Sequence, residues 1–250
     1  MKPAQALREL EAAGTEQNRN VYRRHGVRNE LYGVSYAVQR GLAKKAGRDQ
    51  ALAEELWASG NHDARILATM VADADAVSAG IIDAWSRDLD NYLIMDAFSA
   101  FAAGTPYAED RAQRWINASK EFLSAAGWNI ITTLSMRSDA FDDVTLRSFL
   151  DTIESDIHER KNRVRYAMNG ALIAIGLRSP DFEKRALAVA RSIGKVNVDH
   201  GETGCKTPDA ASYIAKARDR TKKKAMAKKT GGTRTAAKSS GAPKKERRGV

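Results

Sequence analysis

The sequence predicts an all-α fold, built as a solenoid of stacked antiparallel helix pairs. Four of the five prolines precede segments with helical apolar spacing, where proline suits the first turn of a helix: Pro3, Pro106, Pro180 and Pro208. Glycines end several such segments, as C-terminal glycines do. The alternation of Val, Ile and Thr that marks strands is almost absent.

The first half of the chain predicts six helices. Pro3 opens the first, and Gly14, Gly47 and Gly60 end the first, third and fourth. The fourth is amphipathic, whereas Ala64 to Val71 in the fifth is apolar almost throughout. The expected ranges are 4–13, 15–25, 34–46, 48–59, 61–73 and 75–87.

The second half predicts seven more helices. Pro106, Pro180 and Pro208 precede three of them, and the run from Phe122 to Leu134 is apolar enough to be buried on most sides. The expected ranges are 89–103, 106–117, 119–136, 141–157, 162–177, 180–193 and 207–228. The connections are short, except for a loop from Gly194 to Lys206.

Amphipathic helices therefore alternate with more buried ones, as in a solenoid where each pair covers its neighbours. The buried helices recur irregularly, at intervals of about 28 to 42 residues, which favours degenerate HEAT-like (armadillo-type) repeats. Such a solenoid is C-shaped and has a concave side. The alternative is a compact all-α bundle.

Charge divides the chain into residues 1–215, the helical-repeat domain, and residues 216–250, a basic tail. The tail holds 14 Lys and Arg residues against two acids, a net charge of +12, while the rest of the chain carries −2. Its low complexity predicts disorder, and its charge predicts affinity for nucleic acid through Lys222, Lys223, Lys224, Lys228 and Lys229. A tail that merely keeps the protein in solution is the alternative.

The remaining bulk features predict a cytoplasmic protein. Cys205 is the only cysteine, so an internal disulfide framework is excluded. No apolar run approaches the ~18 residues of a membrane span, and the first residues do not resemble a signal peptide. We expect a monomer without a membrane contact, a metal or a small-molecule cofactor, associated with the nucleoid if it binds DNA.

Asp96 is the only charged residue between Asp90 and Glu109, on an otherwise apolar helix. A lone carboxylate there costs several kcal/mol unless it is paired or opens onto a cleft. Tyr92 stands one turn earlier, on the same face. Asp96 is thus either a carboxylate at a cleft wall that stabilises developing positive charge or orients a water, or a buried partner for an arginine of a neighbouring helix, which the residue pattern alone slightly favours.

Other candidates lie in the second half of the chain. Arg160, Lys161, Arg163 and Arg165 open a helix, and a solenoid could gather them on its concave side with clusters around Arg24 and Lys45. All four tryptophans suit a core, and Trp128 is the best candidate among them for the groove. The loop with Asp199, His200, Glu202 and Cys205 could attract a metal, but a structural loop is favoured.

Several of these segments resemble the DNA alkylation repair family of HEAT-like repeat DNA glycosylases. They are Tyr32-Gly-Val-Ser, the stretch from Leu52 to Arg65, the Tyr92–Asp96 helix and Asn169-Gly-Ala-Leu-Ile-Ala-Ile-Gly. The resemblance extends over roughly residues 30–215. It implies a basic concave face that holds double-stranded DNA, and excision of N3- or N7-alkylated purines without a metal and without the usual base flipping.

The same resemblance assigns the catalytic carboxylate to Asp96 and an aromatic contact to Tyr92. The chain departs from the family at two positions. By an ungapped placement, a family arginine falls at Ala125 and a second cleft aromatic at Gly170. We therefore expect a DNA-binding alkylpurine glycosylase that hydrolyses the N-glycosidic bond. The alternatives are a non-catalytic binder of damaged or branched DNA and a protein-binding scaffold.

Overall fold

The computed structural model describes residues 1–137 and 140–220, and this part of the chain contains helices but no strand. Twelve α-helices and a short 3₁₀ helix are bounded as follows: α1 Pro3–Ala13, α2 Glu16–Arg24, α3 Tyr36–Ala46, α4 Gln50–Ala58, α5 His62–Val71, α6 Ala79–Arg87, α7 Tyr92–Ala102, α8 Ala108–Trp115, α9 Glu121–Ser135, α10 Asp143–Asp156, η1 Ile157–Glu159, α11 Asn162–Gly176 and α12 Pro180–Ile193. Residues 210–220 are helical as well.

Side-chain caps fix where most of these helices begin. A Ser, Thr, Asp or Asn at the N-cap accepts a hydrogen bond from a backbone N–H of the first turn, which would otherwise lack a partner. Eight helices start in this way, with Thr15, Ser35, Asp49, Asn61, Ser78, Asn91, Asp142 and Ser179 as the caps. These polar residues make the short connections possible without breaking the stack.

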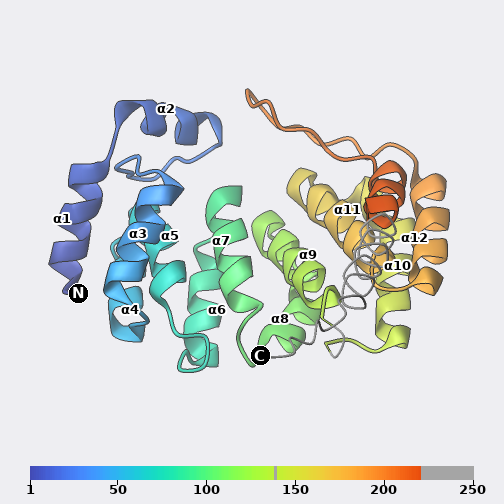
Figure 1. Cartoon of the computed structure of the whole chain (residues 1–250), viewed down its shortest axis with the longest axis horizontal. Helices are drawn as coiled ribbons and strands as arrows, with labels where there is room; N and C mark the ends of the chain where they lie inside the picture. The colour runs from blue at the N-terminus through green and yellow to red at the C-terminus, as the bar shows by residue number, and fades with distance from the viewer. Residues whose placement is uncertain (138–139, 221–250) are drawn as a thin grey trace, which may run out of the picture.

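The helices stand side by side in one curved row from α1 to α12, except α2, which lies across the top of the first helices (Figure 1). Five of them form an inner row in which each packs on the next: α3, α5, α7, α9 and α11. The helices α4, α6, α8, α10 and α12 cover the outer side. The predicted solenoid of helix pairs is confirmed, and the compact bundle is excluded. We call the exposed side of the inner row the inner face.

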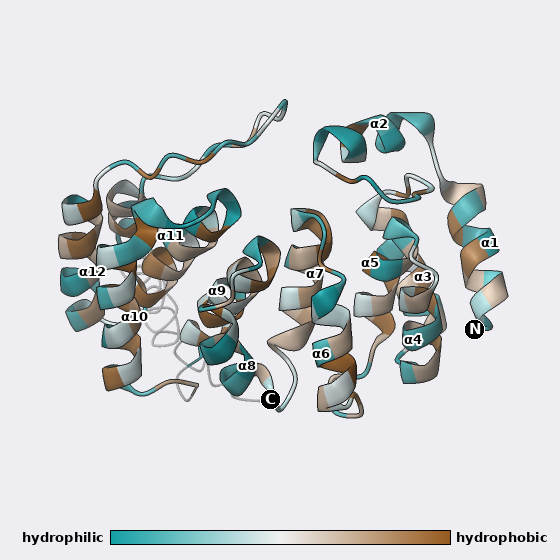
Figure 2. Ribbon diagram, turned by 180° about the vertical axis from the view of Figure 1, so that it is seen from behind, coloured by the Kyte–Doolittle hydropathy of each residue, from teal (hydrophilic) through white to brown (hydrophobic). Residues whose placement is uncertain are grey.

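The core runs the length of the row, where neighbouring helices meet. Figure 2 shows apolar residues along the packed sides of the helices and polar residues on their outer sides. Trp57 of α4 stacks on Trp85 of α6, with ring centroids 4.4 Å apart and planes 5° from parallel. All four tryptophans are buried, as the prediction of core positions required.

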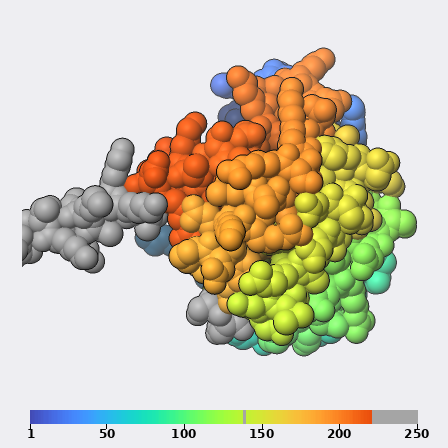
Figure 3. Space-filling model, turned by 90° about the vertical axis from the view of Figure 1, so that its right-hand side faces the viewer, coloured from blue at the N-terminus to red at the C-terminus, as the bar shows by residue number. Residues whose placement is uncertain are grey.

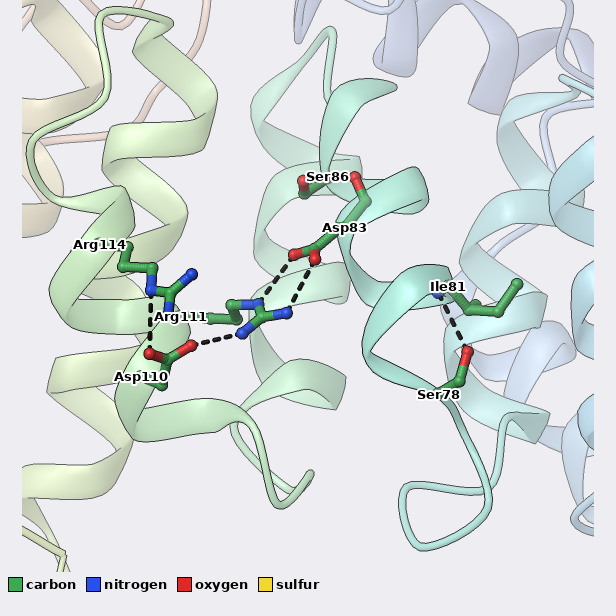
Figure 4. A network of polar contacts seen from close by, with 7 residues as sticks. All are labelled: Ser78, Ile81, Asp83, Ser86, Asp110, Arg111 and Arg114. Atoms are coloured by element: carbon green, nitrogen blue, oxygen red, sulfur yellow. Dashed lines mark hydrogen bonds and ion pairs between the residues drawn. The ribbon is translucent and has the colours of Figure 1, made fainter.

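Ion pairs link successive pairs of helices on the outer side. Arg111 of α8 donates two hydrogen bonds of 2.8 Å to the Asp83 carboxylate of α6, and it also contacts Asp110 (Figure 4). At the α12 end, Arg185 bridges to Asp151 and Glu154 of α10, where the two helices lie against each other (Figure 3). The bidentate geometry fixes the register between neighbouring repeats.

The helical residues 210–220 cross the boundary predicted between domain and tail. Ile214 is fully buried, and Arg218 pairs with Glu183 of α12 at 3.2 Å. Residues 216–220 are therefore docked on the solenoid. The predicted tail lysines Lys222, Lys223, Lys224, Lys228 and Lys229 lie outside the described residues. Within residues 1–137 and 140–220, no helix has the length and apolar character needed to cross a membrane.

Candidate nucleic-acid interface

Asp96 lies near the middle of the inner face. It is exposed to solvent, and its Oδ1 accepts a hydrogen bond of 2.8 Å from Asn129 Nδ2 of α9. The expectation of a carboxylate that opens onto a cleft agrees with this position. The alternative of a buried partner for an arginine does not, because the direct partner is the Asn129 amide.

The surroundings of Asp96 disfavour its charge. Solvent reaches the carboxylate from one side, while the inner helices stand around it on the others. This desolvation raises the pKa of Asp96 to about 6, although the hydrogen bond from Asn129 and the positive charge of Arg163 both act to lower it. A carboxylate with such a pKa changes its charge close to neutral pH.

Tyr92 is held between the Arg163 guanidinium and the His25 imidazole, two groups that are far apart in the sequence. The Arg163 guanidinium of α11 lies 3.6 Å from the centre of the Tyr92 ring, and the Tyr92 hydroxyl hydrogen-bonds to Nδ1 of His25, which follows α2. Burial lowers the pKa of His25, and Arg163 and Arg24 lower it further. One ring face of Tyr92 is therefore already covered by Arg163.

Two further tyrosines border the same surface. Tyr166 of α11 is exposed, and Tyr36 of α3 is half-buried. Burial raises the pKa of both hydroxyls, to about 12 for Tyr36, and the charge of Asp96 adds to the rise in each case. Asp96, Tyr92, Asn129, Arg163 and Tyr166 are the residues that we call the inner-face site.

The structure shows the surroundings of the two positions that depart from the family pattern, Ala125 and Gly170. Ala125 of α9 is fully buried, so no side chain at this position reaches the inner-face site. Gly170 of α11 is next to Thr132, and a Cβ atom there would lie 3.7 Å from Thr132 Oγ1, an ordinary contact. The position could therefore hold a side chain, but it has none.

Trp128 was expected in the groove, and this expectation is wrong. Trp128 is fully buried, and its ring meets that of Phe149 edge-on at 6.0 Å. The polar residues Asn129, Thr132 and Thr133 share the partly exposed side of α9, so this pattern, rather than a position in the middle of the helix, indicates which side faces solvent. Trp128 therefore does not replace the missing aromatic at Gly170.

The basic cluster that opens α11 is divided among three locations. Arg160 and Lys161 donate to the backbone carbonyls of Ile116 and Ser119 in the turn between α8 and α9, at 3.0 and 2.8 Å. Arg163 joins the inner-face site, and Arg165 lines a cavity beside it. Of the other clusters, Lys45 pairs with Glu9 and Arg23 donates to the Val27 and Asn29 carbonyls.

The loop that follows α12 extends over the inner face toward α2 (Figure 1). It is tied to α11, since Asn162 donates to the Asp199 carbonyl and accepts from the Asp199 N–H, both at 2.7 Å. Its tip, with His200 and Gly201, lines a cavity of about 280 Å³ together with Arg24, His25, Tyr92 and Arg163. The predicted structural loop therefore also borders the inner-face site. Among the described residues, no three His, Cys, Asp or Glu side chains gather as a metal requires.

Sequence reasoning missed Asn129, Tyr166 and His25. Asn129 carried a usable signal, because it is a lone amide within the apolar run from Phe122 to Leu134, much as Asp96 is a lone carboxylate. Tyr166 follows Arg163 by three residues and shares its helical face. His25 joins the site only because α2 folds back over α7, which no local pattern reveals.

Comparisons with known proteins agree with this architecture. A family model described as DNA alkylation repair enzyme matches residues 6–214. The Listeria innocua protein Lin0241 is 29% identical over 224 residues, 85% of this chain and 95% of the relative, and the Listeria monocytogenes protein Lmo0209 is 28% identical over 86% and 96%.

A solved structure superposes with a TM-score of 0.81 at 28% sequence identity, over 88% of this chain and 95% of the other. It is described as a new family of proteins related to the HEAT-like repeat DNA glycosylases with affinity for branched DNA structures. The all-α HEAT-like fold predicted from the sequence is thus shown. Because the family model extends over most of the described helices, this chain belongs to the DNA alkylation repair enzyme family.

Proposed function

We propose that this protein binds branched DNA through its inner face, as a non-catalytic member of its family. The observation that carries the proposal is the arrangement of the inner-face site. Arg163 and Tyr92 form a stacked cationic and aromatic pair beside exposed Tyr166, a combination suited to phosphates and unstacked bases. The structural relative with affinity for branched DNA supports the choice of partner.

The site also has features that weigh against base excision. The family arginine is replaced by buried Ala125, the second aromatic by Gly170, and Trp128 is too deep to compensate. The remaining aromatic, Tyr92, has one ring face covered by Arg163. A binder needs only the positive and aromatic surface, and that surface is present.

Binding to a four-way DNA junction, compared with a linear duplex of the same length, tests the proposal. We expect tighter binding to the junction, measured by fluorescence anisotropy. Arg163→Met should weaken junction binding by about tenfold, since it removes both a phosphate contact and the partner of Tyr92.

Arg191→Met is the matched control, because it removes the same charge from an exposed position on α12. If both variants bind the junction equally weakly, the loss reflects net charge alone, and this result would contradict a role for the inner-face site. Equal affinity of the wild-type protein for junction and duplex would contradict the preference for branched DNA.

A second candidate function is hydrolysis of the N-glycosidic bond of a cationic alkylpurine. The observation in its favour is the solvent-open Asp96 carboxylate, oriented by Asn129 at the centre of the inner face. Such a carboxylate could stabilise the positive charge that develops on the sugar as the base leaves. Release of 7-methylguanine or 3-methyladenine from duplex DNA tests this function. If the wild-type protein releases the base and Asp96→Asn does not, the glycosylase function is established. If the wild-type protein binds DNA but releases no base, the glycosylase function is excluded and the binding function remains.

A further inference from the structure

A second cavity lies beside the inner-face site, between α11 and the loop that follows α12. Its volume is about 840 Å³, within the range of small-ligand sites. Arg165 and Asn169, one turn apart on α11, form its floor, and the loop residues Lys195, His200 and Lys206 border it. None of these residues has a role in the binding of DNA by Arg163 and Tyr92.

Three buried polar atoms in this cavity have no hydrogen-bond partner among the described residues. They are Arg165 Nε, Asn169 Oδ1 and His200 Nδ1. Asn169 is only 1% exposed, and a buried amide oxygen without a hydrogen-bond partner destabilises the fold. Three such atoms around one cavity indicate a ligand that supplies the missing partners.

The orientation of the Asn169 amide is fixed by its neighbour. Asn169 Nδ2 donates to the Pro208 carbonyl at 3.0 Å, and a flipped amide would place two oxygens against each other. Oδ1 is therefore the acceptor of this amide that lacks a partner. His200 is similarly constrained, because its Nε2 hydrogen-bonds to Thr207 Oγ1 at 3.0 Å and leaves Nδ1 for the cavity.

The acids of the cavity wall are already engaged. Asp209 Oδ1 accepts from the Ser212 N–H, and Asp199 Oδ1 accepts from the Gly201 N–H, both at 2.8 Å. Lys195 and Lys206 are exposed at the rim. The lining thus combines the Asn169 amide with the Arg165 guanidinium, and its three cationic side chains outnumber its two carboxylates by one.

A nucleotide matches this set of groups. The edge of adenine or cytosine presents an amino donor next to a ring-nitrogen acceptor, which would satisfy Asn169 Oδ1 and Arg165 Nε. Its phosphate would meet Lys195 and Lys206. We infer that this cavity receives an unpaired nucleotide of a branched DNA bound on the inner face, an inference that rests on the proposed function.

The wall between cavity and inner face explains how one DNA could use both. His200 lines this cavity and also the smaller one next to Tyr92, and its ring meets that of exposed Tyr166 edge-on at 5.5 Å. Tyr166 offers a stacking surface at the entrance. A strand that leaves the duplex at a branch point would pass Tyr166 and enter beside His200.

Two three-way junctions test the inference, one fully paired and one with two unpaired adenines at the branch point. Fluorescence anisotropy should show about tenfold tighter binding of the wild-type protein to the second junction. Arg165→Met and Asn169→Leu should each remove this preference and leave affinity for the paired junction within about twofold. Arg191→Met should retain the preference.

The outcomes separate the two proposals. Equal binding of the wild-type protein to both junctions overturns the nucleotide site only, whereas no binding to either junction overturns the proposed function as well. Survival of the preference in both variants also overturns the site. Asn169→Leu loses the hydrogen bond to the Pro208 carbonyl, so thermal melting is used to check that this variant folds. If Asn169→Leu unfolds, Arg165→Met decides the test, because methionine keeps the apolar part of the arginine side chain in place.

Photocrosslinking gives a readout that does not depend on affinity. A 5-iododeoxycytidine at the unpaired position should crosslink to Tyr166 or His200, as identified by mass spectrometry of the conjugated peptide. Crosslinks confined to residues of α3 or α7 would place the unpaired nucleotide elsewhere and overturn the assignment.

Discussion

Asp63 and Asp96 carry the same carboxylate group in two very different environments. Asp63 is fully buried and accepts backbone N–H bonds from Tyr32, Gly33 and Val34 at 2.7 to 2.9 Å. Asp96 is open to solvent and has one hydrogen bond, from the Asn129 side chain. The Asp63 carboxylate fixes the backbone of residues 32–34, whereas the Asp96 carboxylate is accessible to a ligand.

Asp96 should make the stability of the protein depend on pH. Because burial raises its pKa from 3.8 to about 6, the folded state binds the proton more tightly than the unfolded state does. The contribution of Asp96 to stability should therefore fall as pH rises from about 4 to about 6. Asp96→Asn should remove this decline and stabilise the protein at pH 8 by roughly 1 kcal/mol after allowance for solvent screening.

Urea unfolding of the wild type and Asp96→Asn at pH 4 and pH 8 measures the effect. We expect nearly equal free energies of unfolding at pH 4 and a more stable variant at pH 8. A variant that is less stable at pH 8 would show that the ionised carboxylate stabilises the fold, contrary to this argument.

Asp63→Asn should be strongly destabilising, although the change is nearly isosteric. An amide places an NH₂ group against N–H donors of residues 32–34, and this segment has little freedom because Gly33 has φ +81° and packs closely on Thr15. We expect a loss of about 3 kcal/mol in the free energy of unfolding, measured with urea. Asp75→Asn, in an exposed loop, should change stability by less than about 0.5 kcal/mol.

Elements could be predicted from the sequence because their ends carry local signals. The expected 34–46 and 48–59 correspond to α3 and α4 within two residues at each end, owing to caps and terminal glycines. On α9 the polar residues Asn129, Thr132 and Thr133 mark the partly exposed side, but this side is narrow within a mostly apolar run, and the expectation of Trp128 in the groove is wrong. The partners of Asp96 depend on how α7, α9 and α11 stack, and no signal within a single helix contains that information.

Substitution by alanine should have opposite effects on stability at two glycines of the inner helices. A Cβ at Gly170 of α11 has only Thr132 nearby at 3.7 Å, whereas one at Gly127 of α9 would lie 2.8 Å from the Ile116 nitrogen. Gly170→Ala should stabilise the protein by about 0.5–1 kcal/mol, because alanine loses less backbone entropy in a helix. Gly127→Ala should destabilise it by about 1–3 kcal/mol through separation of α8 and α9. Thermal unfolding followed by circular dichroism measures both, and two shifts in the same direction would contradict the packing argument.

Charge is unevenly distributed in the whole molecule. Residues 221–250 hold 11 of the 41 Lys and Arg residues and one of the 31 acids, so 30 of each remain in residues 1–220. The solenoid as a whole is therefore neutral, and the entire net charge of +10 belongs to the last 30 residues. Under the proposed function, residues 221–250 would supply the attraction to DNA at long range, and the inner face would recognise its shape.

Removal of residues 221–250 should consequently weaken DNA binding without a change in preference. Each phosphate neutralised by a lysine or arginine contributes about 0.9 to the slope of log affinity against log salt concentration. The truncated protein should bind a four-way junction more weakly at low salt and with a shallower slope, yet retain its preference for the junction over a duplex, because that preference belongs to the inner face. Titrations from 50 to 300 mM salt with both DNAs measure slope and preference together. An unchanged slope would show that the tail does not contact DNA, and a lost preference would move recognition of branched DNA from the inner face to the tail.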